Sequence, residues 1–174
     1  MKSMEGGDMH PDSKPSLESG QPAEPTLLKR REIEVQIAVP LIQAFAEKLG
    51  REQALAEATG VIQSLARRAG QEMAEKIGAN DLAALAWVVR EIWSADHALD
   101  VEFLEETERQ LRFNVRRCAY VKLYEKLGVK EFGVCLSCCR DASFTEGFNH
   151  RIKLQRTQTI MEGAPLCDFR FTKK

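Results

Sequence analysis

The chain has 174 residues, with 25 basic and 26 acidic side chains and a formal net charge of −1. This length suits a single domain, and a balanced charge without a block of Lys or Arg disfavours binding to nucleic acid or to an anionic membrane. No stretch approaches the ~20 apolar residues that span a bilayer, and the start lacks the apolar centre of a signal peptide. We therefore expect a cytoplasmic protein.

All five cysteines lie in the last third of the chain, from Cys118 onward. An odd number of cysteines without a secretory signal disfavours a disulfide framework, so we expect reduced thiols. Any thiol chemistry must therefore lie in the C-terminal region.

Residues 1–25 are rich in Gly, Pro, Ser and acidic residues. Such a segment has few groups whose burial could offset the entropy of ordering. We predict a disordered tail over residues 1–25 and a single ordered domain over residues 26–174.

Residues 28–49 carry apolar side chains at spacings of three and four, which predicts a helix. Its apolar face comprises Ile33, Ile37, Leu41, Ala44 and Phe45. Residues 33–39 also alternate between apolar and polar, so a strand stays open as an alternative there.

Two more helices are predicted in the first half. Residues 51–77 form a clear amphipathic repeat that ends at Gly78, a typical C-terminal cap. Asn80 or Asp81 can cap a third helix that reaches about Trp93.

The apolar pattern then changes to strict alternation, which predicts strands. The alternating segments are residues 99–103, 111–115, 152–159 and 166–171. Residues 119–127 and part of residues 132–147 are predicted to be helical, and Ser143 with Glu146 fits a capping box. The sum is an α+β fold, with an N-terminal helical half packed on a small, mainly antiparallel sheet of about four strands.

Two arginines fall where the inward-facing rows of predicted strands end. The row that begins at Leu111 continues to Arg117, and the row that begins at Ile152 continues to Arg156. Both are placed to hold an anion at the rim of a cavity. The alternative is that each arginine has left the core and is solvated or paired with a carboxylate.

Cys138 and Asp141 are three residues apart, so on a helix their side chains share a face. A thiol near a helix N-terminus is shifted toward thiolate, which makes Cys138 a candidate nucleophile and Asp141 a candidate proton carrier or orienter of water. The alternative is a buried thiol beside a capping carboxylate.

Cys135 and Cys138 have the C-x-x-C spacing of zinc and redox sites. No second pair exists, and Cys118 and Cys167 would have to complete a zinc site from distant segments, so we predict no metal. Cys167 shares the inward parity of Phe169, which predicts a core-facing thiol.

Four segments of the chain resemble the L-2-amino-thiazoline-4-carboxylic acid hydrolase family. They are FNVRRCAY (113–120), LSCCRD (136–141), EGFN (146–149) and RTQTIMEGAPLCDFRF (156–171). The resemblance extends over about residues 31–171. It implies a hydrolase that opens a small cyclic amidine or thiazoline carboxylate toward N-carbamoyl-L-cysteine-like products, on a bacterial route to L-cysteine.

Such a reaction needs attack on the ring carbon between nitrogen and sulfur, by Cys138 or by a water that Asp141 orients. It also needs groups that hold the substrate carboxylate, stabilise developing charge and line the pocket. The candidates for these roles are Arg117, Arg156, Thr157, Thr159, Cys118 and Cys167. We expect no cofactor and a small molecule as the partner, and homo-oligomer formation is compatible with the sequence.

A second function class also fits. The segment from Gly163 to Phe169 is similar to the end of 4-vinyl-reductase-type domains, which bind small molecules without turning them over. A non-catalytic binding or sensor domain therefore stays open as the alternative.

Overall fold

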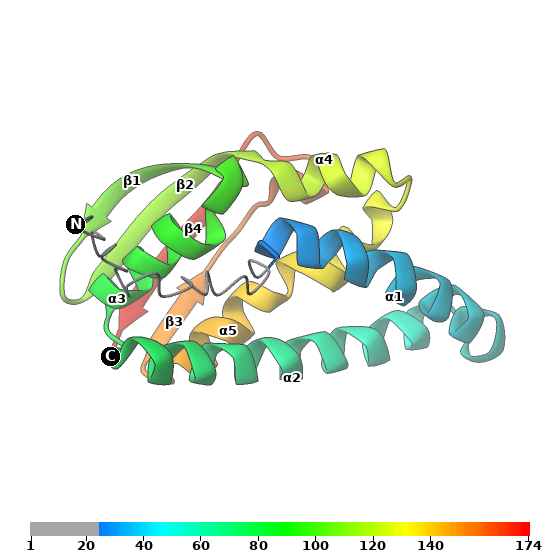
Figure 1. Ribbon diagram of the computed structural model, residues 1–174, viewed down its shortest axis with the longest axis horizontal. Helices are drawn as coiled ribbons and strands as arrows, with labels where there is room; N and C mark the ends of the chain where they lie inside the picture. Colours follow the sequence, from blue (N-terminus) through cyan, green and yellow to red (C-terminus); the bar gives the residue numbers. More distant parts are fainter. Residues whose placement is uncertain (1–24) are drawn as a thin grey trace, which may run out of the picture.

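The computed structural model describes residues 25–174, and the expected tail lies almost entirely outside the described residues (Figure 1). The N-terminal helices are α1 (Leu27–Leu49), α2 (Arg51–Ile77) and α3 (Leu82–Trp87), which continues into a π-helical turn η1 (Val88–Trp93) and a short turn η2 (Ala95–His97). The predicted helix over residues 28–49 is confirmed, and the strand alternative is wrong.

The second half holds four strands and the short helices between them. The strands are β1 (Leu99–Glu106), β2 (Gln110–Cys118), β3 (Ile152–Gln155) and β4 (Cys167–Lys173). The helical segments are α4 (Ala119–Lys126), η3 (Lys130–Phe132), η4 (Val134–Cys138), α5 (Arg140–Phe148) and η5 (Ile160–Glu162). The predicted capping box is wrong, because Ser143 and Glu146 lie inside α5.

The sheet has the order β1-β2-β4-β3, and every neighbouring pair is antiparallel. The α+β prediction is confirmed: α3 and α5 lie on the sheet, and the hairpin of α1 and α2 extends beyond it to one side (Figure 1). Asp81 caps α3 by accepting a hydrogen bond of 2.8 Å from the amide of Ala84. Among the described helices none is both long and apolar enough to cross a bilayer.

The sheet packs against α3, η1 and α5 through a core that we call the aromatic core. Phe113 stacks on Phe169 with ring centroids 4.8 Å apart, and Phe171 lies 5.8 Å from Phe113. Phe113 and Phe171 are completely buried. The alternate side chains of β2 and β4 that were predicted to face the core are therefore buried, and Cys167 is one of them.

Helix α2 lies directly against α5, and glycines permit the close approach. A Cβ atom on Gly70 would lie 2.1 Å from the carbonyl oxygen of Phe144, and one on Gly147 would lie 1.9 Å from that of Arg67. Both distances are far below a van der Waals contact. The two helix backbones can therefore touch only because both residues lack a side chain.

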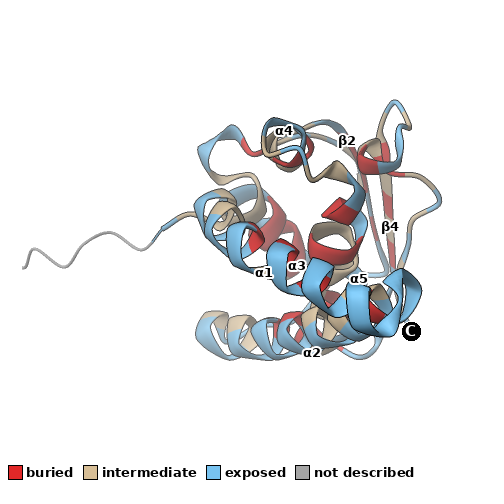
Figure 2. Ribbon diagram, turned by 90° about the vertical axis from the view of Figure 1, so that its right-hand side faces the viewer, coloured by how far each residue is buried: buried red, intermediate tan, exposed pale blue. Residues whose placement is uncertain are grey.

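A second core, which we call the helical core, lies between α1, α2, α4 and η4. Its buried members include Val35, Val39, Ile42, Tyr124 and Leu136. The apolar face expected for α1 is the wrong one, because Ile37 is 63% exposed and Phe45 is 53% exposed. Helix α1 is apolar on two sides: the side with Val35, Val39 and Ile42 packs inward, and the opposite side stays exposed (Figure 2).

Candidate functional site

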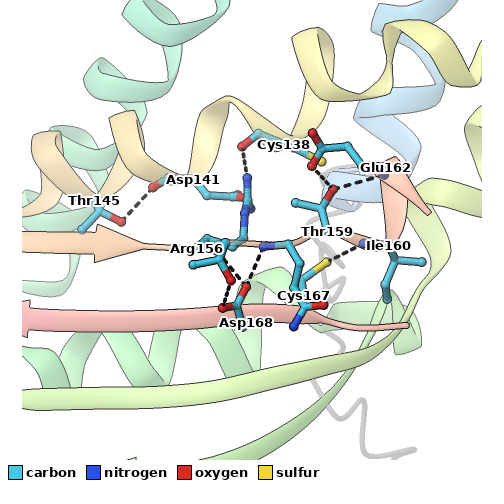
Figure 3. Close-up of polar contacts among 11 residues, drawn as sticks. Cys138, Asp141, Thr145, Arg156, Thr159, Ile160, Glu162, Cys167 and Asp168 are labelled. Atoms are coloured by element: carbon cyan, nitrogen blue, oxygen red, sulfur yellow. Dashed lines mark hydrogen bonds and ion pairs between the residues drawn. The ribbon is translucent and has the colours of Figure 1, made fainter. Parts of the chain in front are cut away.

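Five side chains come together where the aromatic and helical cores meet. Cys138 ends η4, Asp141 lies in the first turn of α5, and Arg156 follows β3. Cys118 ends β2 and Cys167 begins β4. The charge of Asp141 raises the pKa of each of the three thiols, so segments far apart in sequence form one cluster. Figure 3 shows Cys138, Asp141, Arg156 and Cys167 of this cluster.

A π-helical turn positions Cys138. The amide of Cys139 donates to the carbonyl of Val134, five residues earlier, at 2.9 Å. Such a turn holds one more residue than an α-helical turn and is common at functional sites. The following turn begins α5, and the Thr145 hydroxyl donates to the carbonyl of Asp141 at 2.7 Å.

Arg156 links the strand layer to the helical segment that carries Cys138 and Asp141 (Figure 3). Its guanidinium forms an ion pair with the carboxylate of Asp141 and donates to the carbonyl of Cys138 at 3.0 Å. It also lies over the ring of Phe169, 5.1 Å from the centroid. The side chains of Arg156 and Asp141 keep 15% and 24% of their exposure, so the pair is largely buried and in partial contact with solvent.

The thiols of the cluster are held in the neutral form. Burial, and then the charge of Asp141, raises the pKa of Cys138 well above its ordinary value, although Arg156 opposes the rise. Burial also raises the pKa of Cys118 to about 11. The shift toward thiolate expected from the helix end is therefore outweighed, because desolvation and the opposing charge of Asp141 both raise the pKa of Cys138.

Burial raises the pKa of Asp141, while Arg156 lowers it. Burial opposes charge on Arg156, but Asp141 and Cys138 outweigh it, so the pKa of Arg156 is raised. Asp141 is thus a carboxylate paired with a permanent cation, and burial keeps its pKa above the ordinary value.

Arg117 does not join the cluster, contrary to the strand-parity prediction. It is exposed, and it donates to the carbonyl of His97 at 3.2 Å. The pairing register explains the difference: Asp100 pairs with Arg117, but Val101 pairs with Val115. The extra residue is a β-bulge, which reverses the parity of everything after it.

The two predicted threonines stabilise the loop between β3 and β4. The amide and hydroxyl of Thr157 both donate to the carboxylate of Asp168, at 2.9 and 2.8 Å. The hydroxyl of Thr159 donates to Glu162 at 2.6 Å and accepts from the amide of that residue. Their hydrogen bonds are therefore directed away from the Asp141–Arg156 pair.

The remaining cysteines have local packing roles. The Cys135 thiol accepts from the Thr59 hydroxyl at 3.2 Å, and the Cys139 thiol donates to the Cys135 carbonyl at 2.7 Å. All five thiols are free. Within residues 25–174, no group of three His, Cys, Asp or Glu side chains is arranged to hold a metal ion.

Four polar residues beside the cluster were not predicted. Arg31 in α1 and Arg140 in α5 both contact the carboxylate of Glu34, and the hydroxyl of Tyr124 is buried next to them. Arg140 lies within the quoted LSCCRD segment, which was the one available signal. Arg31 and Tyr124 lie on helices α1 and α4, and the apolar pattern of these helices does not reveal which elements pack beside them.

A broad surface depression lies elsewhere, at the far end of the sheet. It is lined by residues such as Asp81, Arg109, Arg151 and Lys174. None of the clustered cysteines, nor Asp141 or Arg156, contributes to it. We place the candidate site at the cluster, because thiols, a carboxylate and a guanidinium converge there.

Comparison with known proteins gives one family and one related fold. Residues 30–171 match the sequence profile of L-2-amino-thiazoline-4-carboxylic acid hydrolase. No curated protein matches the chain significantly. A trafficking protein particle complex subunit 3 from Naegleria fowleri, covalently bound to palmitic acid, is similar in structure with a TM-score of 0.51 and 10% identity, over 84% of this chain and 96% of that one. At this identity the similarity concerns the fold alone.

Proposed function

The chain belongs to the L-2-amino-thiazoline-4-carboxylic acid hydrolase family, and from that premise we propose that it opens a small cyclic amidine or thiazoline carboxylate by hydrolysis. The product is an N-carbamoyl-L-cysteine-like compound. One observation carries the proposal: a partly accessible carboxylate, Asp141, is held by Arg156 among three neutral thiols.

The proposed reaction begins with water at the ring carbon that lies between nitrogen and sulfur. Asp141 accepts a proton from this water as its oxygen bonds to the carbon. The protonated ring nitrogen receives the electron pair of the C=N bond. The carbon–sulfur bond then breaks, and Asp141 returns its proton to the leaving sulfur. The added hydroxyl becomes the carbonyl of the carbamoyl group and releases its proton to solvent, which balances the proton first taken up by the ring nitrogen.

Water is the better nucleophile for this site than the thiol of Cys138. The raised pKa of Cys138 keeps the thiol protonated at neutral pH, and only the thiolate attacks efficiently. The raised pKa of Asp141 acts in the opposite direction, because it makes the carboxylate a stronger base. Cys138 then shapes the pocket beside the reacting carbon.

Arg156 acts as a positioning residue in this scheme. Its hydrogen bonds to Cys138 and Asp141 fix the carboxylate relative to the end of η4. Because the guanidinium is already committed to these partners, the substrate carboxylate needs another cation.

Mass spectrometry of ring opening tests the proposal. The purified protein is incubated with 2-amino-thiazoline-4-carboxylate, and Asp141→Asn should lower the rate by about 100-fold or more. Glu146→Gln is the matched control, since Glu146 is exposed on the same helix and pairs with Arg67. Circular dichroism checks that both variants fold.

Variants of Cys138 and Arg156 distinguish attack by water from attack by the Cys138 thiol. Cys138→Ala should keep most of the activity if water attacks, and should abolish it if the thiol attacks. Loss of activity in Cys138→Ala would therefore overturn attack by water, and full turnover in Arg156→Ala would overturn the positioning role of Arg156.

The second candidate is a binding domain that does not turn its ligand over. The structural neighbour from Naegleria fowleri holds palmitic acid covalently, and the neutral, buried thiols here are suited to packing against a ligand. Saturable binding of cyclic carboxylates without any product would favour this function over hydrolysis.

A further inference from the structure

Arginines outnumber carboxylates around the candidate site. Asp141 pairs with Arg156, while Glu34 is shared by Arg31 and Arg140. The side chains of Arg31 and Arg140 each keep 14% of their exposure, and Glu34 keeps 45%. Two largely buried guanidinium groups thus depend on one carboxylate that stays half in solvent.

Glu34 satisfies the two arginines incompletely. Arg31 and Arg140 both contact the same oxygen, Oε2, with Arg140 at 2.8 Å. Guanidinium groups bind carboxylates best through two parallel hydrogen bonds, so each arginine retains donors that Glu34 does not use. Burial, and then the charge of Arg31, lowers the pKa of Arg140, which is the expected effect of two cations held close together.

The hydroxyl of Tyr124 adds an unused donor to the same place. Tyr124 is completely buried, and its hydroxyl is the one buried side-chain polar atom without a hydrogen-bond partner among the residues that the structure describes. The charges that act on it include those of Arg31, Arg140 and Glu34. A buried hydroxyl without a partner destabilises a fold by about 1–3 kcal/mol, so this group requires an explanation such as a functional role or a bound partner.

The arginine pair lies beside the reacting groups. Arg31 and Arg140 both lower the pKa of Asp141, and Arg140 directly precedes Asp141 in the chain. The Nε atom of Arg140 donates to the carbonyl of Leu136 at 2.8 Å, which anchors the guanidinium against η4. A small molecule bound to the pair by one end can therefore present its other end to Asp141.

We propose that Arg31 and Arg140, with the hydroxyl of Tyr124, bind the carboxylate of a small cyclic α-carboxylate substrate, and that the side chain of Glu34 occupies this position until the substrate displaces it. The proposal rests on the proposed function for the identity of the substrate. It assigns the carboxylate anchor to residues of α1, α4 and α5, in place of Arg117 and Arg156.

Calorimetric binding tests the anchor without turnover. The probe is thiazolidine-4-carboxylate, whose saturated ring has no amidine carbon to attack, and its primary amide is the uncharged comparison. Arg31→Gln and Arg140→Gln should each weaken carboxylate binding by about tenfold or more and leave amide binding unchanged. Tyr124→Phe should weaken carboxylate binding severalfold.

Two further variants separate binding from folding. Arg68→Gln is the matched control, since Arg68 is an exposed arginine on α2 that pairs with Glu72, and it should bind the carboxylate as the wild type does. Glu34→Gln should bind the carboxylate more tightly than the wild type, because the competing side chain loses its charge. A purely structural role for Glu34 predicts weaker binding instead.

The outcomes distinguish this inference from the proposed function. Unchanged carboxylate binding in Arg31→Gln and Arg140→Gln, or equal losses for the carboxylate and the amide, overturns the anchor even if ring opening is observed. Selective loss of carboxylate binding supports the anchor even if the wild type shows no ring opening, and in that case only the hydrolase proposal fails.

Discussion

The aromatic core and the helical core of this molecule bury different kinds of surface. Phe113, Phe169 and Phe171 stack in the first, between strands whose backbone groups are paired. The second buries Tyr124 without a hydrogen-bond partner within the described chain, and it borders two arginines that share one carboxylate. The sheet side therefore supplies rigidity, whereas the α1 side keeps buried polar groups that lower the stability of the fold.

The largest expected effect comes from the aromatic core. Phe113→Ala should lower the free energy of unfolding by about 3–5 kcal/mol, because it removes a fully buried ring and leaves a cavity. Leu104→Ala, at a residue 49% exposed on β1, is the control and should stay within about 0.5 kcal/mol. Urea unfolding measures both, and equal losses would contradict the assignment of Phe113 to the core.

The contact between α2 and α5 should respond next most strongly. Gly70→Ala should lower the free energy of unfolding by about 1–3 kcal/mol or more, because its Cβ would overlap the carbonyl of Phe144. Gly60→Ala on the same helix meets nothing within 4 Å and should gain about 0.5–1 kcal/mol from higher helix propensity. Thermal unfolding of the two variants should therefore shift in opposite directions.

A substitution in the helical core should raise the stability of the fold, in contrast to Phe113→Ala in the aromatic core. Tyr124→Phe removes a buried hydroxyl that has no partner in the described chain, so the free energy of unfolding should rise by about 1 kcal/mol. The same variant should bind the carboxylate probe less tightly. A lower melting temperature for Tyr124→Phe would show that the hydroxyl stabilises the fold.

The smallest expected effect is a pH dependence of stability that comes from Cys118, at the boundary between the two cores. Burial raises the pKa of Cys118 from 9.0 to about 11, so the folded state keeps this proton after the unfolded chain has lost it. Stability is therefore full below about pH 9 and falls as the pH rises toward about 11. Between about pH 8 and 10, the wild type should lose roughly 1 kcal/mol more than Cys118→Ser in urea unfolding. Equal losses would mean that Cys118 titrates normally.

Much of the fold could be predicted because its signals are local. The repeat over residues 51–77, the cap at Asp81 and the alternation in β2 and β4 each depend on near neighbours in the chain. The face of α1 was mistaken because Ile37 and Val39 are equally apolar. Which of them packs inward depends on α4 and η4, which follow much later in sequence.

For the candidate site, the sequence by itself determined Cys138, Asp141 and Arg156, because helical spacing and strand parity placed them on inward faces. Only the tertiary structure decided that a bulge turns Arg117 outward and that Arg31, Arg140 and Tyr124 meet beside Asp141. It also decided that burial keeps the Cys138 thiol neutral. The physical reason is that desolvation and charge pairing depend on distances between side chains from separate elements, which no local pattern contains.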